Sequence, residues 1–255
     1  MKIVILCSNS TSSAIVCNAL SKRFEIDKII VEQSVSKKLL LKRRIKRLGF
    51  FTAMGQVMFS LLVAPILRKA AAKRRKEILR ENGLEDTPRY QTASNTLFVD
   101  SVNAQECKEY LIEAKPDIVV VNGTRIISKE ILECTDAVFI NMHAGITPKY
   151  RGSHGAYWAL CNADAVHAGV TVHLVDPGID TGNIIYQATI TVTEKDNFAT
   201  YPLLQTAAGL PLEIQAIRDI MNHSLHTHTS DLPSKLYYNP TVFQYIRNRI
   251  KLKVK

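Results

Sequence analysis

The sequence contains few of the residues that would cross-link it or bind a metal. Its 255 residues include five widely spaced cysteines, none in a Cys-x-x-Cys pair: Cys7, Cys17, Cys107, Cys134 and Cys161. Neither a disulfide framework nor a zinc site is therefore expected, and a reducing cytoplasmic compartment is predicted. The first residues also lack the apolar run of a secretory signal, since Lys2 is followed only by Ile3 to Cys7.

Glycine is missing where a dinucleotide-binding protein would need it. The first apolar run, Lys2–Ser8, is followed by Asn9 to Ser13 without a glycine, and no Gly-x-Gly-x-x-Gly pattern occurs there. A dinucleotide-dependent oxidoreductase is therefore disfavoured. The loop is rich in hydroxyl groups and precedes a predicted helix. It could hold a phosphate through main-chain N–H groups and side chains such as Ser12.

Acidic residues are almost absent from Ser36–Arg80. This segment holds 14 lysines and arginines and a single acid, Glu77, which gives it a net charge of +13. The whole chain carries +10, so all other residues together carry −3. The basicity therefore belongs to this segment, apart from a short basic run between Arg247 and Lys255.

The middle of the basic segment is apolar. Leu48–Leu67 has 20 positions without a charge, which could cross a bilayer as a helix. Polar residues, glycines and a proline dilute it, and one crossing would separate strands that must join the same sheet. We expect a helical insertion on an anionic membrane surface, peripheral at its inner face, because basic flanks surround an apolar middle. The alternatives are packing on the protein itself, packing on a second copy in a homodimer, and, least favoured, nucleic-acid binding.

Short β-branched runs alternate with helical patterns along the rest of the chain. Strands are predicted at Lys2–Ser8, Lys28–Val31, Asp117–Val121 and Ala137–Asn141, and helices at Ala14–Lys22, Ala104–Ala114 and Ser128–Cys134. Short continuous apolar runs are typical of parallel strands that are buried on both faces. The alternation predicts an α/β fold with an open, doubly wound, mostly parallel Rossmann-like sheet. Ligands bind such sheets at the carboxyl ends of the strands.

Two longer strands are predicted downstream, at Gly169–Val175 and Asn183–Thr193, with a loop between them. Tyr201–Met221 has apolar residues at helical spacing. We therefore expect a catalytic domain over residues 1–221, with the insertion at about 36–80. Residues 222–255 form a C-terminal extension, irregular up to Asn239 and ending in an amphipathic helix within Pro240–Lys255.

Three side chains with complementary chemistry flank these later strands. Asn141 and His143 end an apolar strand, and Asp180 lies in an Ile-Asp-Thr-Gly turn. An amide N–H and a protonated imidazole can both donate to an oxygen that gains negative charge. A carboxylate can keep that imidazole protonated and relay protons through water. No serine or cysteine is paired with a base, so the three residues suit an acyl transfer without a covalent intermediate.

The same stretch resembles the formyltransferases that use 10-formyltetrahydrofolate. The motifs follow in the order Asn141-Met-His143, Pro148-Lys-Tyr-Arg-Gly152, a strand bearing His173, and Ile179-Asp-Thr-Gly182. They match those of the family of glycinamide ribonucleotide, methionyl-tRNA and sugar-nucleotide formyltransferases. The resemblance is specific over about 115–195, weaker over the first 35 residues and absent from about 36–95.

The resemblance implies a formyltransferase fold and particular residue roles. Asn141, His143 and Asp180 would be catalytic, and His173 would support them from a position near Asp180. The family binds its pterin ring through main-chain groups of two loops. This implies that five residues adjoin the co-substrate, 10-formyltetrahydrofolate: Arg125, Ile126, Asp176, Gly178 and Ile179. Gly178 is also expected to permit a tight loop.

Three further residues are candidates for contact with the acceptor. We assign Ser12 from the first loop, and Tyr150 and Arg151 from the loop after the Asn-x-His triplet, because an arginine there could pair with a phosphate or carboxylate. His223, His226 and His228 cluster with only Asp231 nearby, and we interpret them as part of a solvated loop. No metal is expected.

Features that the chain lacks narrow the range of possible formyl acceptors. Methionyl-tRNA members carry an additional C-terminal barrel, for which few residues remain after the last predicted strand. Purine-pathway members have a glycine-rich first loop, which is missing here. We therefore expect a primary amine on a small molecule, preferably an amino sugar attached to a nucleotide. The alternatives are a glycinamide ribonucleotide formyltransferase-like activity, a 10-formyltetrahydrofolate hydrolase, and a non-catalytic membrane-associated scaffold.

Overall fold

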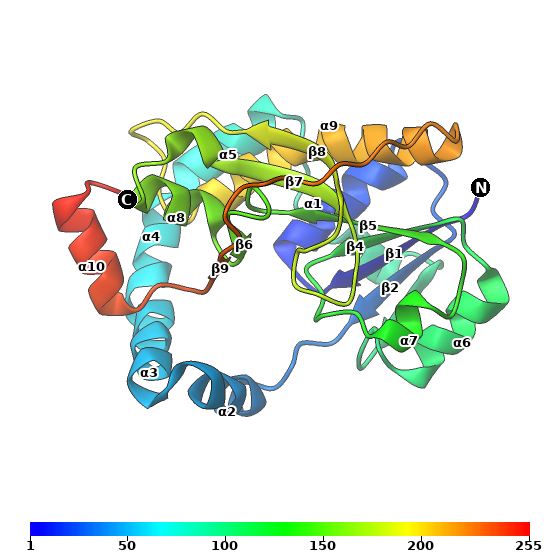
Figure 1. Ribbon diagram of the computed structural model, residues 1–255, viewed down its shortest axis with the longest axis horizontal. Helices are drawn as coiled ribbons and strands as arrows, with labels where there is room; N and C mark the ends of the chain where they lie inside the picture. Colours follow the sequence, from blue (N-terminus) through cyan, green and yellow to red (C-terminus); the bar gives the residue numbers. More distant parts are fainter.

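The computed structural model describes residues 1–255 and has a seven-stranded sheet at its centre (Figure 1). The strand order is β3-β2-β1-β4-β5-β7-β8. The strands are β1 (Ile3–Ser8), β2 (Lys28–Glu32), β3 (Thr96–Val99), β4 (Ile118–Asn122), β5 (Val138–His143), β7 (Gly169–Leu174) and β8 (Ile184–Thr189). The first five are parallel, whereas β7 and β8 are antiparallel to their neighbours. The predicted doubly wound, mostly parallel α/β fold is confirmed.

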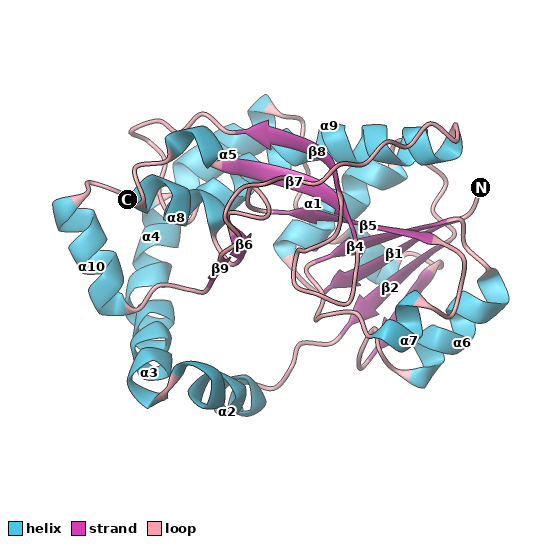
Figure 2. Ribbon diagram, in the orientation of Figure 1, coloured by secondary structure: helices cyan, strands magenta, loops and turns pink.

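Helices cover both faces of the sheet, as Figure 2 shows. Alternate side chains of β1 enter opposite cores, because successive residues of a strand point to opposite faces. Ile3, Ile5 and Cys7 pack beneath α1 (Thr11–Ser21) and α9 (Tyr201–Met221), whereas Val4 and Leu6 pack against α6 (Gln105–Ala114) and α7 (Lys129–Leu132). This two-sided burial explains the continuous apolar runs in the sequence.

Several elements differ from the prediction. The edge strand β3 was missed, because it has four residues and only Val99 of them is buried. The helix α8 (Gly155–Cys161) was also missed, as were two single-turn helices, η2 (Arg89–Thr92) and η3 (Ala165–His167). The last core strand ends at Thr189 rather than Thr193, since Ile190 and Val192 leave the sheet and pack beside an aromatic cluster.

The basic segment forms the predicted helical insertion. Its elements are α2 (Lys37–Leu48), α3 (Phe50–Met58), the π-helical turn η1 (Phe59–Val63), α4 (Ala64–Ala70) and α5 (Ala72–Glu81). Phe50–Ala70 is one helical stretch of 21 residues that is long and apolar enough to cross a membrane by length and composition. Part of the insertion packs on the protein itself, because Phe59 and Ile78 are buried in its cores.

The C-terminal segment returns to the rest of the molecule after α9. This segment runs across the molecule as an extended chain (Figure 1). Its short strand β9 (Leu236–Tyr237) pairs with β6 (Arg151–Gly152), and it ends in α10 (Val242–Lys251) beside α3. Thr241 and Gln244 form a capping box at the start of α10, which the Thr-x-x-Gln spacing signals. The predicted terminal helix is therefore present.

Candidate functional site

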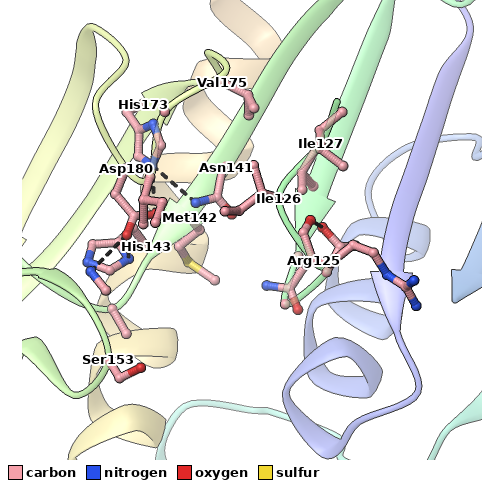
Figure 3. A pocket seen from close by; sticks show the side chains of 18 of the residues that line it. Arg125, Ile126, Ile127, Asn141, Met142, His143, Ser153, His173, Val175 and Asp180 are labelled. Carbon is pink, nitrogen blue, oxygen red and sulfur yellow. Dashed lines mark hydrogen bonds and ion pairs between the residues drawn. The ribbon is translucent and has the colours of Figure 1, made fainter. Parts of the chain in front are cut away.

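The structure brings Asn141, His143, His173 and Asp180 together. Asn141 and His143 are two residues apart on β5, so their side chains leave the same face of the sheet. His173 lies opposite Asn141 on the neighbouring strand β7. Asp180 reaches them from the loop between β7 and β8. Figure 3 shows the four side chains pointing toward one another from these elements.

The ring of His143 is held at both nitrogens. Its Nε2 lies 2.9 Å from the main-chain oxygen of Tyr150, and its Nδ1 lies 3.3 Å from Oδ2 of Asp180. A carbonyl oxygen can only accept, so Nε2 carries the hydrogen of that bond. The ring is 7% exposed. The other nitrogen, Nδ1, is directed toward Asp180. When Nδ1 carries a hydrogen as well, an imidazolium lies beside a carboxylate.

Gly145 makes this arrangement possible. A Cβ atom at position 145 would collide with the Tyr150 carbonyl oxygen and would lie 2.7 Å from Nε2 of His143. Only glycine lets the chain fold back so closely that the carbonyl reaches the imidazole. Gly145 was not among the expected site residues, although it lies two residues after His143 and glycine permits close backbone approach.

Asp180 occupies a conformation that few residues adopt. Its φ is +52°, in the left-handed region that aspartate tolerates better than most side chains. The N–H of Gly152 donates to its Oδ2 at 2.9 Å. The carboxylate is thus fixed by a main-chain donor on one side and faces His143 on the other, while Oδ1 is 3.8 Å from Nε2 of His173.

His173 contacts Asn141 more closely than Asp180. Its Nδ1–H donates to the Leu174 carbonyl at 2.7 Å, which leaves Nε2 as an acceptor 3.1 Å from Nδ2 of Asn141. Burial lowers the pKa of His173 below its ordinary value of about 6.5, and only the neutral ring can accept this hydrogen bond. One N–H of Asn141 is therefore held by His173, and the other is free to donate elsewhere.

These side chains line a cleft of about 470 Å³ at the carboxyl ends of β1, β4 and β5. Such a position, where strand order reverses between β1 and β4, is where open α/β sheets bind ligands. Two walls are the loop 122–127 after β4 and the loop 175–180 after β7. Of the residues assigned from the sequence, ten lie on the cleft: Ser12, Arg125, Ile126, Asn141, His143, His173, Asp176, Gly178, Ile179 and Asp180.

Arg125 contributes to the cleft mainly through its main chain. Its guanidinium points away from the four central side chains (Figure 3), and its Nε lies 2.6 Å from Oε2 of Glu32. The other oxygen of Glu32 accepts the main-chain N–H of Arg125 at 2.7 Å. Glu32 is buried at the end of β2 and fastens the loop 122–127. We did not assign it, although a lone acid ending the run Ile29-Ile-Val-Glu32 was a signal.

Asp176 and Gly178 shape the opposite wall. The carboxylate of Asp176 accepts from the N–H of Gly178 at 3.1 Å and from the hydroxyl of Thr181 at 2.7 Å. A Cβ atom at position 178 would collide with the Thr181 hydroxyl, so glycine permits the tight loop, as expected. These contacts give the loop that carries Asp180 a fixed shape.

Tyr150 and Arg151, the two expected acceptor contacts from the loop after the Asn-x-His triplet, do not line the cleft. Tyr150 is 1% exposed, and its hydroxyl donates to Asp164 at 2.7 Å. Arg151 donates to the Ile179 carbonyl at 3.0 Å. The sequence pattern found the right loop, but its contribution to the site is the carbonyl of Tyr150 and the N–H of Gly152.

The C-terminal segment supplies cleft residues that the sequence did not reveal: Leu236, Tyr237 and Tyr238. Pairing of β9 with β6 holds this segment beside the loop that carries Gly152. The ring of Tyr237 stacks on Tyr150 and on Trp158. A Leu-Tyr-Tyr run within a polar stretch was the available signal. No group of three or more histidine, cysteine, aspartate or glutamate side chains is arranged to hold a metal ion.

Comparison with known families matches residues 63–203 to the formyl transferase family. The chain belongs to this family. The match covers the last core strands, the Asn-x-His triplet and the loop of Asp180, so the resemblance noted from the motifs is confirmed.

Curated relatives of this formyltransferase family member are methionyl-tRNA formyltransferases. That of Thermodesulfovibrio yellowstonii is 41% identical over 100 residues, which are 39% of this chain and 32% of the relative. That of Halothermothrix orenii is 33% identical over 146 residues, 55% of this chain and 46% of the relative. The chain thus spans about a third to a half of the length of these relatives.

Solved structures with the same fold include sugar and purine enzymes. A sugar N-formyltransferase from a Shewanella species covers 93% of this chain and 76% of its own, at a TM-score of 0.58 and 14% identity. The N-formyltransferase of Helicobacter canadensis, solved with folinic acid and dTDP-3-aminofucose, covers 93% and 71% at a TM-score of 0.58 and 18% identity. The match to the phosphoribosylglycinamide formyltransferase of Streptococcus pneumoniae covers 87% of this chain and 99% of that enzyme. Its TM-score is 0.55 and the sequence identity is 18%. At these identities the likeness concerns the fold.

Proposed function

We propose that this protein transfers a formyl group from 10-formyltetrahydrofolate to a primary amine of a small molecule, and that the amine belongs to an amino sugar carried on a nucleotide. One observation carries the proposal. An amide and an imidazole from β5 and a carboxylate from the loop between β7 and β8 meet on one cleft, an arrangement that suits formyl transfer without a covalent intermediate.

The cleft residues fit a reduced folate. Apolar side chains of Val121, Ile127 and Val175 provide flat walls, and main-chain groups of the two bounding loops provide donors and acceptors between them. The volume is within the range of small-molecule sites. The co-substrate would supply the formyl group to be transferred.

Asn141 and His143 are placed to stabilise the carbonyl oxygen of that group. When the amine nitrogen bonds to the formyl carbon, negative charge develops on this oxygen. The N–H of Asn141 that His173 does not hold can donate to it. So can the Nδ1–H of His143, because 3.3 Å to Asp180 is long for a charge-assisted bond and leaves room for a second acceptor.

Asp180 is placed to manage protons. As the new bond forms and the bond from the formyl carbon to the leaving nitrogen breaks, the amine must lose a proton and the leaving nitrogen must gain one. The carboxylate of Asp180 stabilises the imidazolium of His143 and can pass a proton through an ordered water. The N–H of Gly152 keeps the carboxylate turned toward the cleft.

Three observations favour an amino sugar as the acceptor. The first loop lacks the glycines expected for a ribonucleotide phosphate. The sequence match to methionyl-tRNA formyltransferases covers less than half of those proteins, so it does not carry their acceptor over. Fold neighbours include sugar N-formyltransferases, one of them solved with an amino sugar on dTDP.

An acceptor screen tests the proposal. The protein is incubated with 10-formyltetrahydrofolate and, separately, a dTDP-linked amino sugar, glycinamide ribonucleotide or methionyl-tRNA, and tetrahydrofolate and the formylated amine are measured. Turnover with the amino sugar alone is expected. Turnover with another amine would correct the acceptor. Formate released without any amine would show a hydrolase, and tight folate binding without turnover would favour a non-catalytic protein.

A further inference from the structure

We propose that α2, the Phe50–Ala70 helix and α10 form one docking surface that lies in the plane of an anionic membrane. This proposal goes beyond formyl transfer and does not depend on it. The surface combines exposed apolar side chains on two adjacent helices with cationic side chains around them, and it lies beside the cleft.

The Phe50–Ala70 helix has one face buried and the other exposed. Phe59 packs against Phe198 and Tyr245, and the side chain of Gln56 donates to the Asn239 carbonyl at 2.8 Å. On the outer side the exposed fractions are large for apolar residues: Phe51 89%, Leu61 69%, Leu62 57% and Ile66 68%. Water would not stabilise such a concentration of apolar surface, which marks an interaction site.

The helix α10 repeats this division. Val242, Tyr245 and Asn248 recur at helical spacing and are buried, whereas Phe243 and Ile250 are 71% and 69% exposed. The rings of Phe59 and Tyr245 are 5.2 Å apart, so the two helices share one buried seam. Their exposed faces lie on the outside of this seam. The sequence did not reveal that the terminal basic helix belongs with the insertion.

The helix α2 adds the positive charge. It has no buried residue, and seven lysines and arginines lie between Lys37 and Arg47. None of them forms an ion pair, whereas Arg74 and Arg75 of α5 pair with Asp196 and Asp86. A helix of 12 residues that buries no side chain is marginal in water. Its free cations and its exposed Leu39 and Leu40 therefore point to an anionic surface.

An anionic bilayer fits this surface better than a second copy of the chain. A second copy would bring two strongly basic surfaces together, which electrostatic repulsion opposes. Lipid headgroups of negative charge instead attract each cation, while acyl chains receive the aromatic and aliphatic side chains. The packing of Gln56 and Phe59 and the parallel pairing of β2 with β3, which flank the insertion, keep the helix on one side of the membrane.

The docking surface adjoins the cleft. The guanidinium of Arg47, at the end of α2, lies 5.0 Å from the ring centre of Tyr238, a cleft residue. Docking would therefore place the cleft next to the membrane surface, where an amine near the bilayer could reach it.

Vesicle binding of the full-length protein tests the proposal. Co-sedimentation is measured with vesicles of phosphatidylcholine alone and of phosphatidylcholine mixed with phosphatidylglycerol. We expect binding only to the mixed vesicles and release by a high-salt wash. The pair Lys42→Ala and Arg43→Ala should weaken binding about tenfold or more. The exposed pair Phe51→Ser and Leu62→Ser should weaken it at least as much.

Matched variants control for general effects on charge and apolarity. Arg23→Ala with Lys129→Ala removes two exposed cations elsewhere, and Phe98→Ser with Val166→Ser removes two exposed apolar side chains elsewhere. Both should bind like the unchanged protein. Equal binding by all variants would overturn the proposal, as would retention after the salt wash, which indicates a spanning helix. It would also fail if vesicles were not bound and the Phe51 and Leu62 changes instead dissociated a dimer. None of these results bears on formyl transfer.

Discussion

Asn141 and His173 face each other across β5 and β7, with Nδ2 of the amide 3.1 Å from Nε2 of the ring. The Leu174 carbonyl fixes the hydrogen of His173 on Nδ1, so the ring can only accept from Asn141. This pair decides which way the amide of Asn141 faces. The proposed oxyanion donor is therefore oriented by a residue that need not touch the substrate.

His173→Leu should lower kcat by about 10- to 100-fold while leaving KM for the folate almost unchanged, because Asn141 loses its orientation. His173→Gln retains an acceptor and should keep more of the rate. Steady-state kinetics with both variants across a pH series distinguishes positioning from packing. Equal loss in the two variants would point to packing.

Asp180→Asn should reduce turnover by about 100-fold or more, because the amide cannot stabilise the imidazolium of His143 or relay a proton. Asparagine tolerates a positive φ as aspartate does, so the loop should keep its shape. Folate affinity, measured by calorimetry, should change little. A near-normal rate would show that the proton path avoids Asp180.

Glu32→Gln should weaken folate binding about tenfold, because the buried carboxylate that accepts the Arg125 N–H and faces its guanidinium loses its charge. The loop 122–127 would then be held less firmly. Titration with folinic acid measures the affinity, and Glu25→Gln, an exposed change, serves as the control. Unchanged affinity would mean that other contacts suffice to hold the loop.

Glu213→Gln should stabilise the protein at alkaline pH. Burial raises the pKa of Glu213 from about 4.5 to about 8, and its carboxyl oxygens have no hydrogen-bond partner. Between about pH 4.5 and about 8 the unfolded chain releases this proton while the folded protein retains it, so the free energy of unfolding falls as pH rises through this window. Urea denaturation below and above this pH window should show the fall in the free energy of unfolding in the unchanged protein and a smaller fall in the variant. An equal fall in both proteins would contradict this prediction.

The sheet and the residues of the candidate site could be predicted from different features of the sequence. Continuous apolar runs such as Ile118–Val121 indicate strands buried on both faces, whatever they pack against. Asn141, His143 and Asp180 were found because their motifs are local and ordered. Tyr150 was expected near the acceptor, whereas its carbonyl contacts His143 and its hydroxyl contacts Asp164, and no sequence pattern distinguishes these roles.

The amino-acid sequence by itself determined every core strand except β3, the basic insertion and the chemistry available at the strand ends, because these follow from local spacing and residue type. Tertiary structure alone decided which groups meet. Glu32 reaches Arg125 across 93 residues, and Gln56 reaches Asn239 across 183. Such contacts depend on the packing of entire elements, and packing is a property of the folded chain rather than of any segment in it.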